Sequence, residues 1–309
     1  MKNVDHRRRI VLKKAVLILA MAAAARAGSG VYRDAGSAAF QFLKLETSAR
    51  ASALGGTSLM NSGSMSILSS PSALASLGGA GISFCHAAHF GSTTQNSMAF
   101  HTRAGRASVA FGATSVYTGG MELRDGASSE PLGEFSCWDI GLAAGAGMDL
   151  GPFDAGVAAR LIREKIWTSG TWGFSFDAGV SALPAEWLRI SAAFLNIGPE
   201  ADFEDGSFRL PATWRAGASA NAELPLAGAS TLTGEVWKSI DGRPQAGVGL
   251  ETVPAGWAAL RAGFRAGSDA VSATAGAGLT AAGWTLDYAW LPSGSPIGDI
   301  HRISLSRSL

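Results

Sequence analysis

Charged residues and long apolar runs are both scarce in this chain of 309 residues. Asp, Glu, Lys and Arg make up 16% of it, against about 25% in an average protein. The formal net charge is +1, which gives no electrostatic basis for binding nucleic acid. Beyond the N-terminal region, no segment offers the roughly 20 consecutive apolar residues that a membrane helix needs. The composition is that of a lipid-facing protein without lipid-spanning helices.

Cysteine is rarer still, with two residues, Cys85 and Cys137. Both fall on segments that we predict to be different strands. An oxidising compartment would favour a bridge between them, but the sequence does not set the Cα distance that a bridge requires. Two unpaired thiols are the favoured interpretation, and a disulfide is the alternative.

The first residues have the pattern of an export signal. Basic residues between Lys2 and Lys14 precede the apolar stretch AVLILAMAAAA at 15–25, and Ala25-Arg26-Ala27 follows. This order is typical of a secretory signal peptide, whereas an anchoring helix, the alternative, needs a longer apolar core. We expect residues 1–27 to be a cleaved signal peptide.

Glycine is abundant, with 40 residues, and it decides how the apolar stretches fold. Residues 138–162 read WDIGLAAGAGMDLGPFDAGVAARLI, and each glycine would cost a helix about 1 kcal/mol. Every second residue from Trp138 to Leu150 is apolar, and those between are small or polar, which is the period of a strand. Gly151-Pro152 predicts a tight turn into a second strand with the same alternation.

The alternation recurs to the C-terminus and predicts about fourteen strands, an even number as in bacterial membrane barrels. They are 81–91, 95–103, 106–118, 136–150, 153–167, 171–182, 187–197, 212–224, 229–238, 244–252, 257–266, 270–281, 283–291 and 299–309. Links after even-numbered strands are short, and the two longest, 119–135 and 198–211, follow odd-numbered ones. This asymmetry between turns and loops is typical of outer-membrane barrels.

The alternative is a soluble β-sandwich, whose inward faces carry bulky aliphatic side chains. The second face of these strands is Gly, Ser, Thr, Asp and Arg, which favours a polar lumen. We therefore expect an all-β fold, a transmembrane antiparallel β-barrel of about 14 strands formed by residues 81–309.

Residues 28–80 do not alternate, and we predict that they form an N-terminal hatch or plug segment with a short helix over Phe40 to Ala53. A barrel of this size leaves a lumen in which the apolar side chains of the segment can be buried. A periplasmic extension is the alternative. The candidate hatch residues are Phe40, Phe42, Leu43, Leu45, Ser70, Pro71, Ser72, Ala73 and Leu74.

Two stretches of this segment, AFQFLKLETSARASALGGTSL and SPSALASLGGAGISFCHAAHF, carry a family resemblance. They resemble the start of PorV/PorQ outer-membrane proteins, relatives of the FadL fatty-acid transporters, which read FLK-x-G-x-x-ARAxAMGG and then NPAGLA. Later segments such as FSFDAGVSALP and LPSGSPIGDIHRISLSRSL continue the likeness across 39–309. Ser70 stands where the family has Asn, and Leu309 where an aromatic residue commonly ends the barrel. The resemblance implies a 14-stranded barrel with an N-terminal hatch.

The resemblance favours a partner-binding role in protein secretion of the type IX kind, at the outer membrane of a Gram-negative-type bacterium. The alternatives are a FadL-like channel for small hydrophobic molecules and a structural barrel. The lumen-facing set of Gly, Ser, Asp and Arg argues against an apolar route, and the modest loops argue against docking of large cargo. The expected partners are the lipid bilayer, the barrel-assembly machinery, and secretion-system proteins or secreted cargo, but no nucleic acid.

We expect no enzyme, cofactor or metal site. His86 and His89 are three apart on a strand and point to opposite faces, so one ion cannot easily take both. Neither a nucleophile elbow nor a phosphate loop in strand–turn–helix context is present. The candidate extracellular-loop contacts are Glu122, Arg124, Asp125, Glu200, Asp202, Glu204 and Asp205.

Overall fold

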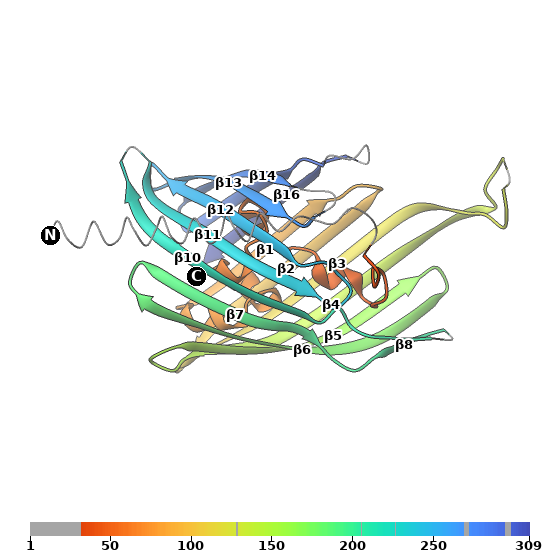
Figure 1. The fold of residues 1–309 in the computed structure, drawn as a ribbon, viewed down its shortest axis with the longest axis horizontal. Helices are drawn as coiled ribbons and strands as arrows, with labels where there is room; N and C mark the ends of the chain where they lie inside the picture. The colour runs from red at the N-terminus through yellow and green to blue at the C-terminus, as the bar shows by residue number, and fades with distance from the viewer. Residues whose placement is uncertain (1–31, 128, 205, 226, 269–271, 294–297) are drawn as a thin grey trace.

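The computed structural model describes residues 32–309, with gaps at 128, 205, 226, 269–271 and 294–297. The predicted signal peptide, residues 1–27, lies outside this range. Fourteen strands of the described chain form one closed antiparallel barrel (Figure 1), in which neighbours follow chain order except that β7 pairs with β10. The predicted fold class, a closed β-barrel, is confirmed.

The first seven barrel strands are β1 (Ala80–Ala88), β2 (Thr93–Ala104), β3 (Ala107–Leu123), β4 (Gly133–Asp149), β5 (Asp154–Ile166), β6 (Ser169–Ala185) and β7 (Leu188–Ile197). The other seven are β10 (Thr213–Leu224), β11 (Gly228–Ser239), β12 (Gln245–Val253), β13 (Ala258–Ala266), β14 (Ala273–Ala281), β15 (Trp284–Leu291) and β16 (Ile300–Ser308). The barrel closes where β1 pairs with β16, from Gly81 opposite Ser308 to Ala88 opposite His301. Closure leaves the sheet without an edge, as a strand structure in lipid requires.

The two faces of the strands differ as their alternation predicts. On β4 and β5, Leu142 and Val157 are 50% and 60% exposed on the outside, whereas Ala143 and Ala158 are buried on the lumen side. The same alternation gives the whole barrel an apolar outer surface. Among the described residues, no helix is long and apolar enough to cross a membrane.

The two ends of the barrel are unequal. At the end that holds Ala80 and Ser308, which we call the turn end, the strands are joined by short turns; the Leu150 amide donates to the Phe153 carbonyl at 3.0 Å across Gly151-Pro152. At the other end, the loop end, the hairpin of β3 and β4 projects well beyond its neighbours (Figure 1). The predicted tight turn at Gly151-Pro152 is confirmed.

Of the two long loops predicted at the loop end, 119–135 is wrong in extent, whereas 198–211 does join β7 to β10. Loop 119–135 is shorter, because β3 continues to Leu123 and β4 begins at Gly133, with a register shift between Thr118 and Met121 that lets the pairing resume. Loop 198–211 contains a separate two-stranded hairpin, β8 (Ala201–Phe203) and β9 (Gly206–Phe208).

Residues 38–77, which we call the inner segment, lie inside the barrel. The segment contacts β3–β6 through some of its turns and β13–β16 through others, and only an interior position allows both. Figure 1 shows its short helices surrounded by strands. Its elements are η1 (Gln41–Lys44), α2 (Ala49–Ala53), η2 (Ser58–Met60), η3 (Ser64–Leu68) and η4 (Pro71–Ser76).

The single helix predicted over Phe40 to Ala53 is wrong. The backbone is extended at Leu45, after the 3₁₀ turn η1, and α2 begins anew after Ser48, whose hydroxyl accepts from the Ala51 amide at 3.4 Å. The break between the two helices sends the Glu46 side chain toward the barrel wall, where its carboxylate lies beside two arginines of the strands.

Inward-facing glycines let the inner segment approach the wall. A Cβ at Gly145 would lie 2.7 Å from the Ile67 Cδ1 atom, and one at Gly156 would overlap the carbonyl group of Pro71. Gly145, Gly147 and Gly156 therefore serve the packing of the lumen, whereas Gly151 has a positive φ in the turn, where a Cβ would meet nothing.

We expect Gly156→Val to lower the free energy of unfolding by about 1–3 kcal/mol, because the new side chain overpacks against rigid backbone. Ala155→Val, on the neighbouring outward-facing position, should change it little. Urea titration in detergent micelles, followed by heat-modifiable gel migration, measures both. Equal losses in the two variants would contradict the close packing of the segment.

Candidate functional site

Charged side chains of the wall point into the lumen and pair there. Arg160 of β5 and Asp177 of β6 lie 2.5 Å apart with side chains 4% and 0% exposed. Arg160 also donates to the Leu68 carbonyl of the inner segment at 2.6 Å. One ion pair thus joins two strands to the segment.

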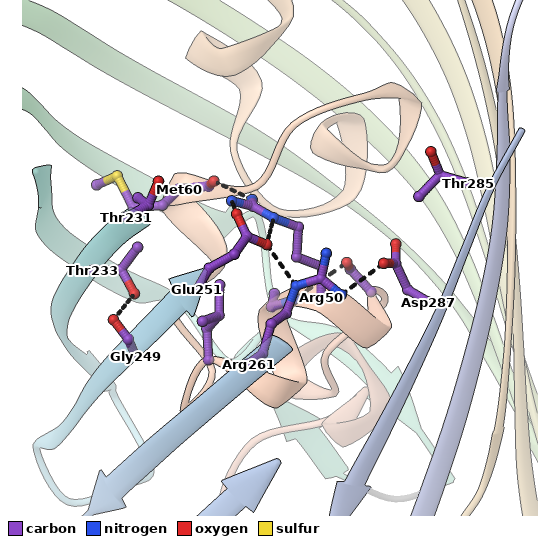
Figure 2. Close-up of polar contacts among 12 residues, drawn as sticks. Arg50, Met60, Thr231, Thr233, Gly249, Glu251, Arg261, Thr285 and Asp287 are labelled. Carbon is purple, nitrogen blue, oxygen red and sulfur yellow. Dashed lines mark hydrogen bonds and ion pairs between the residues drawn. The ribbon is translucent and has the colours of Figure 1, made fainter. Parts of the chain in front are cut away.

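A chain of four charges lies on the opposite side of the lumen (Figure 2). Glu251 of β12 accepts two hydrogen bonds of 2.8 Å from the guanidinium group of Arg50 on α2, and one of 2.6 Å from Arg261 of β13. Arg261 reaches on to Asp287 of β15 at 2.7 Å. The bidentate geometry fixes both the position and the orientation of the helix. Arg50 also donates to the Met60 carbonyl at 3.0 Å.

A second group of charges surrounds Glu46. Its carboxylate lies 3.5 Å from Arg215 of β10 and 3.8 Å from Arg265 of β13. Arg215 also pairs with Glu235 of β11, which accepts from the Leu59 amide at 2.9 Å. The segment is therefore held through both its side chains and its backbone. Arg215 and Arg265 stack over the Trp237 ring, with 4.8 and 5.1 Å to its centroid.

The inner segment is also fixed at the loop end. The Asp241 carboxylate accepts from Lys44 at 2.9 Å, from Gln41 at 2.7 Å and from Ser239 at 2.6 Å. Burial alone would raise the pKa of this carboxyl group, but the hydrogen bonds and the charge of Lys44 hold the pKa below its ordinary value. Asp241 is therefore a carboxylate at neutral pH.

The inward face of β1–β5 combines small apolar residues with polar ones such as Ser97, Thr114 and Arg160. We define the apolar strip as the buried inward-facing residues Cys85, Ala99, Ala110, Val116, Ala143, Ala158 and Ile162. Ile67, Leu68 and Leu74 of the inner segment pack on its turn-end part, and Phe40 and Phe42 on its loop-end part. The expected lumen-facing set of Gly, Ser, Asp and Arg is therefore incomplete, because alanines and other small apolar residues also face inward.

The candidate hatch residues all lie in the inner segment. Phe40, Ser70 and Leu74 are 0% exposed. Phe42, Pro71, Ser72 and Ala73 are buried, and Leu43 and Leu45 are partly buried against the cluster at the loop end. Their role in gating stays a prediction.

The candidate extracellular contacts are divided between two hairpins. Glu122 is a strand residue of β3 rather than a loop residue, and it pairs with Arg124 at 2.8 Å; Asp125 follows them. Asp202 of β8 accepts from the Ser207 hydroxyl at 2.6 Å, and Glu204 accepts from Ser169. Glu200 directly precedes β8, and Asp205 lies outside the described residues.

The residues predicted from the sequence do not include the partners of the charge network, Arg50, Glu251, Arg261 and Asp287. A signal for three of them was present, since charges at inward positions of a membrane strand must pair within the lumen. Nothing in the sequence indicated which acid meets which arginine.

The remaining candidates for chemistry are separate from one another. His86 hydrogen-bonds Asn96 at 2.8 Å, and His89 hydrogen-bonds Gln95 at 3.1 Å. Cys85 and Cys137 are both free, as favoured. In the part of the chain that the structure describes, no group of three or more His, Cys, Asp or Glu side chains is placed to hold a metal ion.

Comparison with solved structures identifies the fold as that of FadL-type outer-membrane barrels. The Pseudomonas putida toluene transporter TodX matches with a TM-score of 0.57 at 12% identity, over 85% of this chain and 97% of that one. The TodX deltaS2S3 mutant, a monoaromatic hydrocarbon channel, gives 0.63 at 10% identity, over 84% and 98%. A Pseudomonas aeruginosa FadL homologue gives 0.52 at 10% identity, over 85% and 99%. No family model and no curated protein matches the sequence.

We expect Glu251→Gln to cost about 3–5 kcal/mol of unfolding free energy, because it leaves two buried guanidinium groups without their shared carboxylate. The matched control is Glu122→Gln, which breaks an exposed pair and should cost less than about 1 kcal/mol. Urea titration in micelles compares them. A loss at Glu251 as small as that at Glu122 would show that the network does not hold the segment.

Proposed function

We propose that this protein is an outer-membrane channel for small hydrophobic molecules, with the inner segment as its hatch. The observation that carries the proposal is the apolar strip, which forms one cluster with the inner segment at the loop end and a second in the turn-end half of a barrel with the TodX fold. An apolar molecule needs such a wall, since apolar surface removed from water gains about 25 cal/mol per Å².

The turns and loops support an orientation. Short turns face the periplasm and longer loops face outward in barrels of this kind, so the loop end is the outer mouth. A hydrophobic molecule entering there meets Phe40, Phe42 and Ile162, which close the strip in the observed state. The lipid bilayer and the barrel-assembly machinery are the partners that this location requires.

The two sides of the inner segment are held differently. Ion pairs join the segment to β10, β12 and β13, whereas on the side of the strip apolar contacts are combined with hydrogen bonds from Arg103, Ser108 and Arg160 to backbone carbonyls of the segment. Opening would withdraw η3 and η4 from the wall, with loss of the Arg160 hydrogen bond to the Leu68 carbonyl, while α2 keeps its hold on Glu251.

A role in protein secretion is the second candidate, and the projecting β3–β4 hairpin favours it (Figure 1). The similar structures include a toluene transporter and a monoaromatic hydrocarbon channel, which supports the channel instead. Deletion of the gene separates the two, because loss of the channel leaves the set of secreted proteins unchanged.

We expect a disulfide between Ser72→Cys and Gly179→Cys to block uptake of radiolabelled toluene, because it ties η4 to β6. A Cβ at position 179 lies 3.4 Å from the Ser72 hydroxyl oxygen, close to the separation that a disulfide needs. The background carries Cys85→Ser and Cys137→Ser. Reductant should restore uptake to the untethered level.

The matched control ties the anchored side, with Thr57→Cys and Thr233→Cys, whose hydroxyl oxygens lie 3.0 Å apart. This tether should leave uptake intact, since the segment stays in place there. Uptake that persists with η4 tethered would contradict the hatch, and uptake blocked by both tethers would mean that the segment moves as a whole.

A further inference from the structure

A polar cavity of about 220 Å³ lies between the inner segment and the strands β6, β7, β10 and β11. It is on neither the apolar strip nor the outer surface. The segment contributes Arg50, η2, the two residues after it, and η4, and the wall contributes inward-facing residues near the turn end. The cavity exists only while the segment is seated, because both sides are needed to enclose it.

One amide in this cavity lacks a partner. Asn61 is 6% exposed and lines the cavity. One end of its amide meets the Ser48 hydroxyl at 3.2 Å, and the other, Nδ2, has no hydrogen-bond partner in the described part of the chain. Whichever way the amide is turned, one polar end is left over, at a cost that a bound polar group or water would remove.

The wall adds groups that both donate and accept hydrogen bonds. Ser191, Ser219, Asn221 and Thr231 line the cavity on three neighbouring strands. Arg189 places one nitrogen, Nη1, 3.0 Å from both Asp154 and Ser181. The other guanidinium nitrogens make no hydrogen bond to the residues described here.

The charges beside the cavity are already balanced. Arg189 is paired with Asp154, and Arg50 with Glu251, whose second arginine partner is in turn paired with Asp287. A charged ligand would therefore be buried without a counter-charge, which is costly. Hydroxyl groups match the mixed donors and acceptors without that cost, and Leu59 and Met60 supply an apolar patch for a carbon skeleton.

The cavity is accessible from the turn end. Ser62, Ser76 and Asn221 line it and are exposed. Asn221 lies near the last residue of β10, and Arg189 is the second residue of β7, so both are close to the turns. The loop end is closed by the cluster around Phe40. In the proposed orientation, the cavity is accessible to solutes from the periplasm.

We propose that this cavity binds a neutral polyhydroxylated molecule of monosaccharide size from the periplasmic side. Several waters of about 30 Å³ each would fill the same space. One such molecule replaces them and supplies a hydrogen-bond partner for the free end of the Asn61 amide. This cavity is separate from the proposed path of hydrophobic molecules. Its lining is rich in Ser, Asn, Thr and Arg, and it lies beside β6, β7, β10 and β11 rather than beside the apolar strip. A ligand that fits only the seated segment also stabilises the closed state.

Calorimetric titration of the full chain tests the site, in a detergent without a sugar headgroup. The probes are D-glucose, glucuronate as its charged counterpart, and toluene. We expect saturable binding of glucose, a higher melting temperature with glucose present, and no competition by toluene. Because uptake is not measured, failure of the channel function leaves this result unaffected.

Two variants locate the binding. Ser219→Leu fills the cavity and should weaken glucose binding by about tenfold or more, whereas Ala218→Leu, on the outward face of the same strand, should not. Asn61→Ala should weaken it too, with heat-modifiable migration as the check that the barrel is formed. Absence of saturable glucose binding would mean that the cavity holds only water. Tighter binding of glucuronate, or competition by toluene, would overturn the assigned ligand class.

Discussion

The pairing of buried charges within the lumen is the constraint on which the rest of this structure depends. Charges on membrane strands cannot face lipid cheaply, so Arg215, Glu235, Glu251 and Arg261 face inward. Their partners must come from the lumen itself, because water is excluded where the segment packs. The inner segment supplies them through Arg50, Glu46 and backbone groups. A single regular helix could not reach partners on so many strands. The inner segment therefore consists of a series of short helical turns.

The same constraint divides the lumen into two unlike sides. Where ion pairs hold the segment, the strands carry long charged side chains. Where apolar packing predominates they carry many glycines and alanines, and Arg103 and Arg160 also donate hydrogen bonds to the segment backbone there. Gly145, Gly147 and Gly156 bring the wall so close that a single Cβ would collide with Ile67, Leu74 or Pro71. Close packing on one side and salt bridges on the other together position a segment that has little regular structure of its own.

The period of two in the sequence predicts the barrel strands, but it does not predict the fold of the inner segment. A period of two, read from residues such as Trp138 to Leu150, located every barrel strand, because lipid on one face and lumen on the other leave a strong alternation. The hairpin extension of β3 and β4 was missed, because beyond the barrel neither face is constrained by lipid. The break at Leu45, and the pairing of Arg50 with Glu251, depend on contacts between residues far apart in the chain, for which local sequence carries no signal.

The difference between the two sides also determines which contacts a substrate can replace. Apolar contacts between Ile67 or Leu74 and the strip are non-directional, so a hydrophobic molecule of similar area substitutes for them at little net cost. No such molecule can replace the carboxylate of Glu251, because removing one partner leaves the others buried and uncompensated. Any exchange of the segment for an apolar substrate would therefore begin at the strip, where it also has to break the Arg160 hydrogen bond to Leu68, and it would leave the contacts of Glu251 in place.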